Sequence, residues 1–265
     1  MACTRIQLDT GISLVVARPH GAPTRRVLLL HGIGGNARSC SEAAELLSAQ
    51  GIEAYAWDAP GYGESADPSG PVDHPGEVLA AVDELGLDQV DLFGTSWGGV
   101  IATQVAARAP ERVRSLVLAD STRGSATSPE QAAGMAARVT ALTELGAAEF
   151  AATRAPRLVS ASAPASVGQQ VREVMATVRP PGYRSAAEFM ARTDNTALLR
   201  ELRTPTLVVV GADDVVTGVA ESRLLAELVP GASFEVIPEA GHSAVTERPE
   251  ELVRVLTAFW GVLDD

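Results

Sequence analysis

The chain opens with two short segments in which apolar and polar residues alternate. These segments, residues 5–9 and 12–17, flank Thr10-Gly11, and alternation on both sides of a turn predicts an antiparallel β-hairpin. Further along, short continuous apolar runs replace the alternation, which is typical of strands that are buried on both faces of a parallel sheet. Those runs cover residues 27–30, 54–57, 90–93, 113–119, 206–210 and 234–237.

Between the apolar runs lie segments whose apolar residues recur with a helical period. They cover residues 41–50, 77–85, 98–109, 219–228 and 249–263. Regular alternation of strand and helix predicts a mostly parallel sheet with helices on both faces, and the opening hairpin adds antiparallel strands at one edge. We therefore expect the α/β class, with an eight-stranded sheet.

The stretch from Arg123 to about Leu202 interrupts this alternation. It has no strand-like run, is rich in Ala and Arg, and contains Pro180-Pro181-Gly182, which predicts a break in the chain. Apolar residues recur there at helical spacing in two groups, Met135, Val139 and Leu142, and Val167, Val171, Val174 and Val178. We expect a core made of residues 1–122 and 203–265, with residues 123–202 inserted as a helical cap.

Composition excludes several classes of partner. The chain has 265 residues and a formal net charge of −12, which disfavours nucleic acid and an anionic membrane surface, because both need a basic footprint. No segment approaches the ~20 apolar residues of a membrane span. All 21 cationic side chains are Arg, so an anion in a pocket would be held by an Arg side chain or by backbone N–H groups.

The two cysteines, Cys3 and Cys40, suggest neither a disulfide framework nor a metal site. The first nine residues are polar and lack the apolar stretch of a signal peptide. These features predict a protein of the reducing cytoplasm.

Gly94-Thr95-Ser96-Trp97-Gly98 is the strongest chemical motif. It follows the apolar run 90–93 and precedes a helical segment, which is the context of a sharp strand-to-helix turn. Such a turn lifts the central hydroxyl above the sheet and places it at a helix N-terminus, where developing negative charge is favoured. The motif predicts that Ser96 is a nucleophile.

A second motif, His31-Gly32-Ile33-Gly34-Gly35-Asn36, directly follows the run 27–30. A Gly-rich turn at this place exposes backbone N–H groups, which can form an oxyanion hole with the N–H of the residue after the nucleophile, Trp97. We expect the N–H of Ile33 to be the second donor, with Gly34 as the alternative. A plain strand-to-helix turn would explain the same residues, and His31 is expected to organise the loop.

A serine hydroxyl needs a base, and His242 is the only one of four histidines that follows both the nucleophile and the candidate acids. The base in turn needs a carboxylate that fixes its tautomer. Asp213 and Asp214 both follow the run 206–210, and Asp120 follows the run 113–119. Spacing alone does not choose among these three carboxylates.

These motifs resemble the α/β-hydrolase superfamily over essentially the full chain. The matching pieces are His31-Gly32 with the glycines that follow, the run 58–65, the turn at Ser96, Gly211-Ala212-Asp213-Asp214 and Gly241-His242. The resemblance implies that the acid stands three residues after Gly211, which favours Asp214 and gives the order Ser96, Asp214, His242. It also implies that the run 58–65 is structural.

The inserted segment resembles the cap of small esterases, of 3-oxoadipate enol-lactonases and of C–C bond hydrolases. Two departures stand out: Cys40 replaces a bulky aromatic residue, and Trp97 replaces a small or aliphatic one. Both would reshape the pocket. Five apolar cap residues could line that pocket or form the cap's own core: Phe150, Met175, Tyr183, Phe189 and Met190. One of five cap arginines could meet a substrate carboxylate: Arg123, Arg138, Arg154, Arg157 or Arg192.

The resemblance implies a serine hydrolase that cleaves a small-molecule carboxylic ester or lactone through an acyl-enzyme, without a metal or an organic cofactor. Three alternatives remain at this stage. The first is hydrolysis of a C–C bond in a diketone-type substrate, the second is a cofactor-free perhydrolase or haloperoxidase, and the third is a ligand-binding module without turnover.

Overall fold

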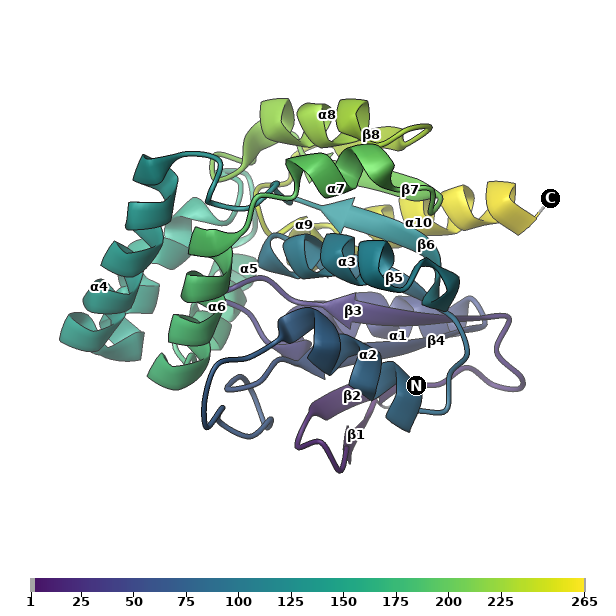
Figure 1. The fold of residues 1–265 in the computed structure, drawn as a ribbon, viewed down its shortest axis with the longest axis horizontal. Coiled ribbons are helices and arrows are strands. Elements are labelled where there is room, and N and C mark those ends of the chain that lie inside the picture. The colour runs from purple at the N-terminus through teal and green to yellow at the C-terminus, as the bar shows by residue number, and fades with distance from the viewer. Residues whose placement is uncertain (1–2, 265) are drawn as a thin grey trace.

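One eight-stranded sheet forms the centre of the molecule in the computed structural model, which describes residues 3–264 (Figure 1). The strands are β1 (Thr4–Gln7), β2 (Ser13–Ala17), β3 (Arg25–Leu30), β4 (Ile52–Asp58), β5 (Val90–Thr95), β6 (Val113–Ala119), β7 (Thr206–Gly211) and β8 (Ser233–Ile237). They are arranged in the order β1-β2-β4-β3-β5-β6-β7-β8. The strand β2 runs antiparallel to β1 and β4, and all other pairs are parallel. The mostly parallel eight-stranded sheet is as predicted.

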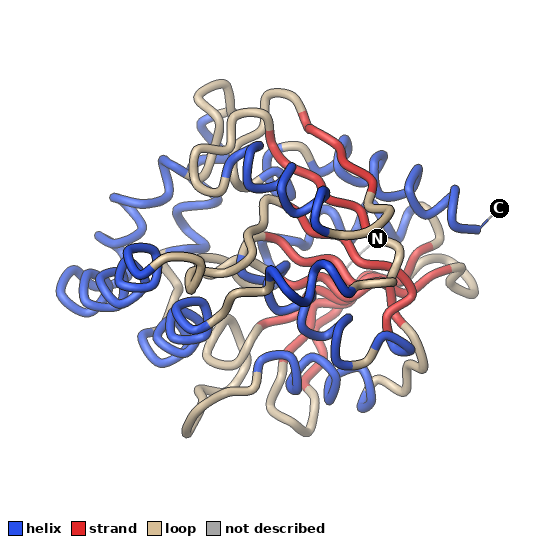
Figure 2. Tube along the Cα trace, turned by 45° about the horizontal axis from the view of Figure 1, so that its top comes forward, coloured by secondary structure: helices blue, strands red, loops and turns tan. Residues whose placement is uncertain are grey.

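Helices cover both faces of the sheet (Figure 2). They are α1 (Ser41–Ala49), α2 (His74–Glu84), α3 (Trp97–Arg108), α8 (Gly218–Leu228), α9 (Ala244–Glu247) and α10 (Pro249–Asp264). The apolar side chains of α1, α9 and α10 form one buried cluster with one face of the sheet, and those of α2, α3 and α8 form a second with the other face. The core is therefore divided into two layers by the sheet.

The central strand β3 shows why the parallel strands appear as continuous apolar runs. Leu28 and Leu30 join one buried cluster, while Val27 and Leu29 join the other. Successive side chains of a strand point to opposite faces, and both faces of β3 are covered by helices. No position between Val27 and Leu30 faces water, so no polar alternation is present in the sequence.

The segment between β6 and β7 contains helices and, within the described residues, no strand. The helices are α4 (Pro129–Arg154), α5 (Ala165–Met175), α6 (Pro180–Arg192) and α7 (Thr196–Glu201). Helices α4 and α6 pack on each other and lie beyond one end of the sheet (Figure 1). Gly146 has non-helical backbone angles, φ 75° and ψ 162°, and divides α4 into two helical arms. The boundaries of the expected cap, 123–202, stay a prediction.

Two details of this segment differ from the sequence expectation. The helix α5 ends at Met175, so Val178 lies beyond it. Pro180 and Pro181 begin α6. Proline is favoured in the first turn of a helix because its missing N–H would have no partner there, so a proline pair marks a helix start as well as a break.

Cys40 ends a short 3₁₀ helix, η1 (Ala37–Cys40), and is completely buried. Burial raises the pKa of its thiol to about 12. Within residues 3–264, no helix combines the length and apolar character needed to cross a membrane.

Candidate active site

Ser96 occupies the sharp turn between β5 and α3. Its backbone angles are φ 53° and ψ −118°, a conformation that costs free energy for any residue other than glycine. A Cβ added at Gly94 would lie 2.4 Å from the Gly98 carbonyl carbon, and one added at Gly98 would lie 2.3 Å from the Leu30 oxygen. Only glycine at both positions lets strand and helix approach closely enough to form this turn.

The structure brings Ser96, His242 and Asp214 together in one hydrogen-bonded row. Ser96 Oγ lies 3.0 Å from His242 Nε2, and His242 Nδ1 lies 3.0 Å from Asp214 Oδ2. The His242 and Asp214 side chains are almost completely buried. A hydroxyl beside one ring nitrogen and a carboxylate beside the other is the arrangement that activates a serine nucleophile.

Asp214 has two roles in the structure, because its carboxylate contacts both His242 and the turn that follows it. Burial alone would raise its pKa, but the hydrogen bonds from His242, Thr217 and the Val216 N–H outweigh burial and lower the pKa to about 2. Its Oδ2 also accepts from Thr217 Oγ1 at 2.6 Å, and its Oδ1 accepts from the Val216 N–H at 2.7 Å. A single carboxylate therefore faces the base and fixes the turn. No sequence motif marked Thr217 as part of this site.

The other two aspartates have different partners. Asp213 Oδ2 accepts a hydrogen bond from Ser160 Oγ at 2.5 Å. Asp120 is completely buried and accepts from the N–H groups of Gly211 and Ala244, at 2.8 and 3.3 Å. Burial and the nearby Asp214 charge raise the pKa of Asp120 well above its usual value. Neither carboxylate has a hydrogen bond to His242.

The backbone after β3 packs against Ser96. The Gly32 oxygen accepts hydrogen bonds from His31 Nδ1 and from the Gly35 N–H, both at 2.8 Å. Because the peptide unit is planar and trans, the Ile33 N–H points away from that oxygen. A Cβ on Gly32 would lie 3.3 Å from the Ser96 Cβ, so this peptide packs directly on the nucleophile.

The candidate oxyanion donors make no hydrogen bond to the described part of the chain. Within residues 3–264, no hydrogen bond uses the N–H of Ile33, Gly34 or Trp97. N–H groups without a protein partner are suited to donate hydrogen bonds to an oxyanion. The choice between Ile33 and Gly34 rests on the orientation of the Gly32–Ile33 peptide, and the oxyanion-hole role of Ile33 and Trp97 remains a prediction.

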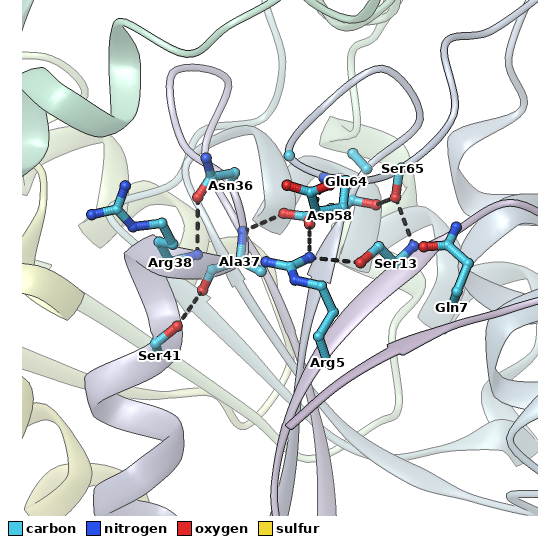
Figure 3. A network of polar contacts seen from close by, with 12 residues as sticks. Arg5, Gln7, Ser13, Asn36, Ala37, Arg38, Ser41, Asp58, Glu64 and Ser65 are labelled. Atoms are coloured by element: carbon cyan, nitrogen blue, oxygen red, sulfur yellow. Dashed lines mark hydrogen bonds and ion pairs between the residues drawn. The ribbon is translucent and has the colours of Figure 1, made fainter. Parts of the chain in front are cut away.

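His31 organises this loop. Its Nε2 accepts a hydrogen bond from the Ala59 N–H, so the ring proton is on Nδ1 and is donated to Gly32. Burial lowers the pKa of His31, which keeps the ring neutral. Asp58 also supports this loop. Its carboxylate accepts hydrogen bonds from the Ala37 N–H at 2.8 Å and from Arg5 Nη1 at 2.5 Å (Figure 3).

Two cavities meet at Ser96. The first, of about 90 Å³, lies on the His242 side and is lined by residues of the β3 loop together with side chains of α4, α5 and α6. The second, of about 250 Å³, lies on the Trp97 side. Ile33, Ser96, Arg138 and Val216 line both cavities. Ser96 is therefore accessible from two chambers.

The apolar cap residues divide between the cavities and the core. Met175 and Tyr183 line the first cavity, and Met190 lines the second. Phe150 and Phe189 belong to the buried apolar cluster and line neither of these two cavities. Cys40 is likewise absent from both linings, so its replacement of an aromatic residue acts inside the core.

Of the five cap arginines, two line the first cavity and three lie elsewhere. Arg138 and Arg154 line the first cavity. Arg123 pairs with Glu221 at 3.0 Å. The guanidinium of Arg192 lies 5.9 Å from the centre of the Phe189 ring, and Arg157 is exposed.

Glu247 is a residue of this region that the sequence analysis missed. It is buried on α9, and its carboxylate accepts from the Gly241 N–H at 2.8 Å and from the Ser160 N–H at 2.7 Å. It therefore connects the loop that carries His242 with the inserted segment. Glu247 is the last residue of the short helix α9, and a single glutamate in such a segment is too common for any sequence signal to mark this role. In the described part of the chain, no group of three or more His, Cys, Asp or Glu side chains is placed to hold a metal ion.

A protein-family model described as "alpha/beta hydrolase fold" matches residues 25–249. Among curated proteins, 3-oxoadipate enol-lactonase 2 of Acinetobacter baylyi is 31% identical over 201 residues, which is 73% of this chain and 73% of the relative. The 2-hydroxymuconate semialdehyde hydrolase of Pseudomonas putida is 30% identical over 252 residues, covering 89% of this chain and 87% of that protein.

Among solved structures, a thermophilic esterase from Thermogutta terrifontis, studied with malate bound, superposes with a TM-score of 0.87 at 26% identity. The superposition covers 98% of each chain. Sheet, loops and inserted helices are thus all shared with a known esterase.

Proposed function

The chain belongs to the alpha/beta hydrolase fold family and is a hydrolase, and from this premise we propose that it cleaves a small carboxylic ester or lactone through an acyl-enzyme on Ser96. The observation that carries the proposal is the row Ser96 Oγ, His242 and Asp214, with both contacts at 3.0 Å. The names of the relatives, an enol-lactonase and an esterase, support the choice of ester and lactone bonds.

In the first half of the reaction, His242 Nε2 takes the proton of Ser96 as its oxygen attacks the substrate carbonyl. The Nδ1–H of His242 donates to Asp214, whose low pKa keeps it charged and able to stabilise the imidazolium. The N–H groups of Ile33 and Trp97 donate to the oxyanion. When the tetrahedral intermediate collapses, His242 Nε2 returns the proton to the leaving alkoxide, and the acyl group stays on Ser96.

In the second half, His242 removes a proton from water, and the resulting hydroxide attacks the acyl carbonyl. The same N–H groups hold the second oxyanion, and Ser96 leaves with its proton restored. Loss of one oxyanion donor would cost on the order of 3 kcal/mol of transition-state stabilisation.

The test compares wild type with Ser96→Ala on p-nitrophenyl acetate and p-nitrophenyl butyrate. Wild type is expected to show a burst of p-nitrophenol followed by steady turnover, and Ser96→Ala should lose nearly all of both, because the triad acts as a unit. Ser166→Ala, a change of an exposed serine in the inserted segment, is the matched control and should retain full activity.

A fluorophosphonate probe gives a second readout that does not depend on the ester chosen. It should add one phosphonyl group to wild type and to Ser166→Ala, and none to Ser96→Ala. Labelling of Ser96→Ala, or equal ester turnover by all three proteins, would show that Ser96 is not the nucleophile.

A further inference from the structure

The first cavity beside Ser96 has a positive lining in a chain of net charge −12. Its ionisable lining side chains are Arg138, Arg154, Tyr183 and His242, and none of its lining residues is Asp or Glu. Low-dielectric walls concentrate the field of such charges inside a cavity. The interior of this cavity therefore attracts anions, although the molecule as a whole repels them.

The kink of α4 explains how the two arginines reach one cavity. Arg138 lies eight residues before Gly146, and Arg154 lies eight residues after it. The positive φ of Gly146 turns the second arm of α4 away from the direction of the first. A straight helix would separate these two positions by about 24 Å along its axis, too far for both to line so small a cavity.

Neither guanidinium has a counter-ion among the residues that the structure describes. Within residues 3–264, no carboxylate oxygen lies within ion-pair distance of Arg138 or Arg154, whereas Arg123 in the same segment is paired with Glu221. Arg154 is partly buried, and its guanidinium lies 5.5 Å from the centre of the Phe150 ring. Burial and the positive charge of Arg138 both lower the pKa of Arg154. Two like charges that line one cavity are unfavourable, and a bound anion would relieve that cost.

We propose that Arg138 and Arg154 form a carboxylate subsite, so that the substrate is an ester or lactone carrying a second, ionised carboxyl group. This inference rests on the proposed function of Ser96 and names its substrate class. The guanidinium fork matches the two oxygens of a carboxylate. Gln170 and Tyr183, which also line the cavity, supply further hydrogen-bond donors.

The size of the cavity limits the substrate. At about 90 Å³, and at roughly 10 to 15 Å³ for each water-sized position, it holds a short chain between the carbonyl and the carboxylate. Half-esters of four- and five-carbon diacids meet both requirements. Arg138 and Ser96 both line both cavities, so a substrate held by Arg138 can share a chamber with the nucleophile.

The test measures kcat/KM for monomethyl succinate and monomethyl glutarate against their neutral isosteres, methyl 4-methylpentanoate and methyl 5-methylhexanoate. Wild type should prefer at least one half-ester over its isostere by roughly tenfold or more, as expected for hydrogen bonds to a charged group. Arg154→Gln and Arg138→Gln should each lower kcat/KM for the half-ester by roughly 10- to 100-fold, and change the isostere by less than about threefold. Arg157→Gln, an exposed arginine of the same segment, is the control and should change neither substrate.

A binding experiment separates this inference from the proposed function. Glutarate is titrated into Ser96→Ala, and into the same protein carrying Arg154→Gln, by calorimetry. If glutarate binds to Ser96→Ala and the additional Arg154→Gln change removes that binding, the subsite is supported. If in the same case wild type hydrolyses no ester, only the proposed function fails. Hydrolysis of neutral esters without half-ester preference or glutarate binding overturns the subsite and leaves the proposed function standing. Equal loss on half-ester and isostere would show that the arginines are structural.

Discussion

At the scale of single residues, the three candidate acids differ in what they contact. Asp214 faces His242, Asp213 faces Ser160, and Asp120 accepts backbone N–H groups while its pKa is raised by burial. Sequence spacing could not separate Asp213 from Asp214, because adjacent residues of a turn point in directions that depend on its backbone angles. Only the resemblance to a family favoured Asp214, and the geometry now supports that choice.

Asp214→Asn should lower kcat on p-nitrophenyl butyrate by roughly 10²- to 10⁴-fold, because an amide no longer fixes the tautomer of His242 or stabilises its charged form. Asp213→Asn, the matched change one residue away, should stay within about fivefold of wild type. Steady-state kinetics of both variants at neutral pH measures the difference. A larger loss for Asp213→Asn than for Asp214→Asn would reverse the assignment.

The residues that the sequence could identify are those with a chemical motif. Ser96 was marked by flanking glycines and His242 by its place after the last strand, whereas Thr217 and Glu247 act through hydrogen bonds that no local pattern encodes. The sequence could only name Arg138 and Arg154 among five candidate arginines of the inserted segment. It showed neither the kink at Gly146 nor which side chains that kink turns towards the cavity.

At the scale of elements, the parallel strands were predictable because helices cover both faces of the sheet and leave continuous apolar runs. The fold class and the mostly parallel eight-stranded sheet are confirmed. The inserted helices were less predictable. Some of their apolar residues pack between α4 and α6, and others line the cavities. The spacing of apolar residues therefore predicts that the segment is helical, but it does not predict where each helix begins and ends.

Glu247 on α9 connects the loop that carries His242 with the inserted segment through two hydrogen bonds, and its removal should affect both stability and turnover. Glu247→Ala would leave the N–H groups of Gly241 and Ser160 without their acceptor. We expect a loss of roughly 1 to 3 kcal/mol in the free energy of unfolding. We also expect kcat on p-nitrophenyl butyrate to fall by roughly tenfold with KM little changed, because the loop carrying His242 loses its support.

Glu247→Gln should recover part of kcat, since its amide oxygen still accepts one of the two N–H groups. Glu250→Ala, at the exposed start of α10, is the control for removing a nearby carboxylate. Urea unfolding and steady-state kinetics are measured on all three variants. A Glu247→Ala protein that is destabilised but has wild-type kcat would restrict this residue to a structural role.

At the scale of the whole molecule, stability should fall as the solution becomes acidic. His74 on α2 is buried between the rings of Trp97 and Phe189, and its Nε2 lies 3.0 Å from Ser185 Oγ on α6. Burial lowers its pKa to about 4, below the ~6.5 of an unfolded chain. Between these two values the unfolded state binds a proton that the folded state does not, so the free energy of unfolding decreases as pH falls.

The contribution of His74 between pH 7 and pH 4.5 should be about 2 to 3 kcal/mol. His74→Gln, which keeps a polar contact for Ser185, should remove that part of the pH dependence. Urea unfolding of wild type and variant at the two pH values isolates it, because every other titrating group is common to both. Parallel stability curves for the two proteins would contradict the assignment.

The thiol of Cys40 is unreactive in the folded protein because it is buried. The reactive form of a cysteine is its thiolate, and a pKa of about 12 leaves almost none of it at neutral pH. Alkylating reagents and oxidants therefore reach this sulfur only when η1, which follows the candidate oxyanion loop, leaves its packing against the core. The rate at which Cys40 is modified therefore measures how often the structure opens locally beside the active site. No engineered label is needed for this measurement.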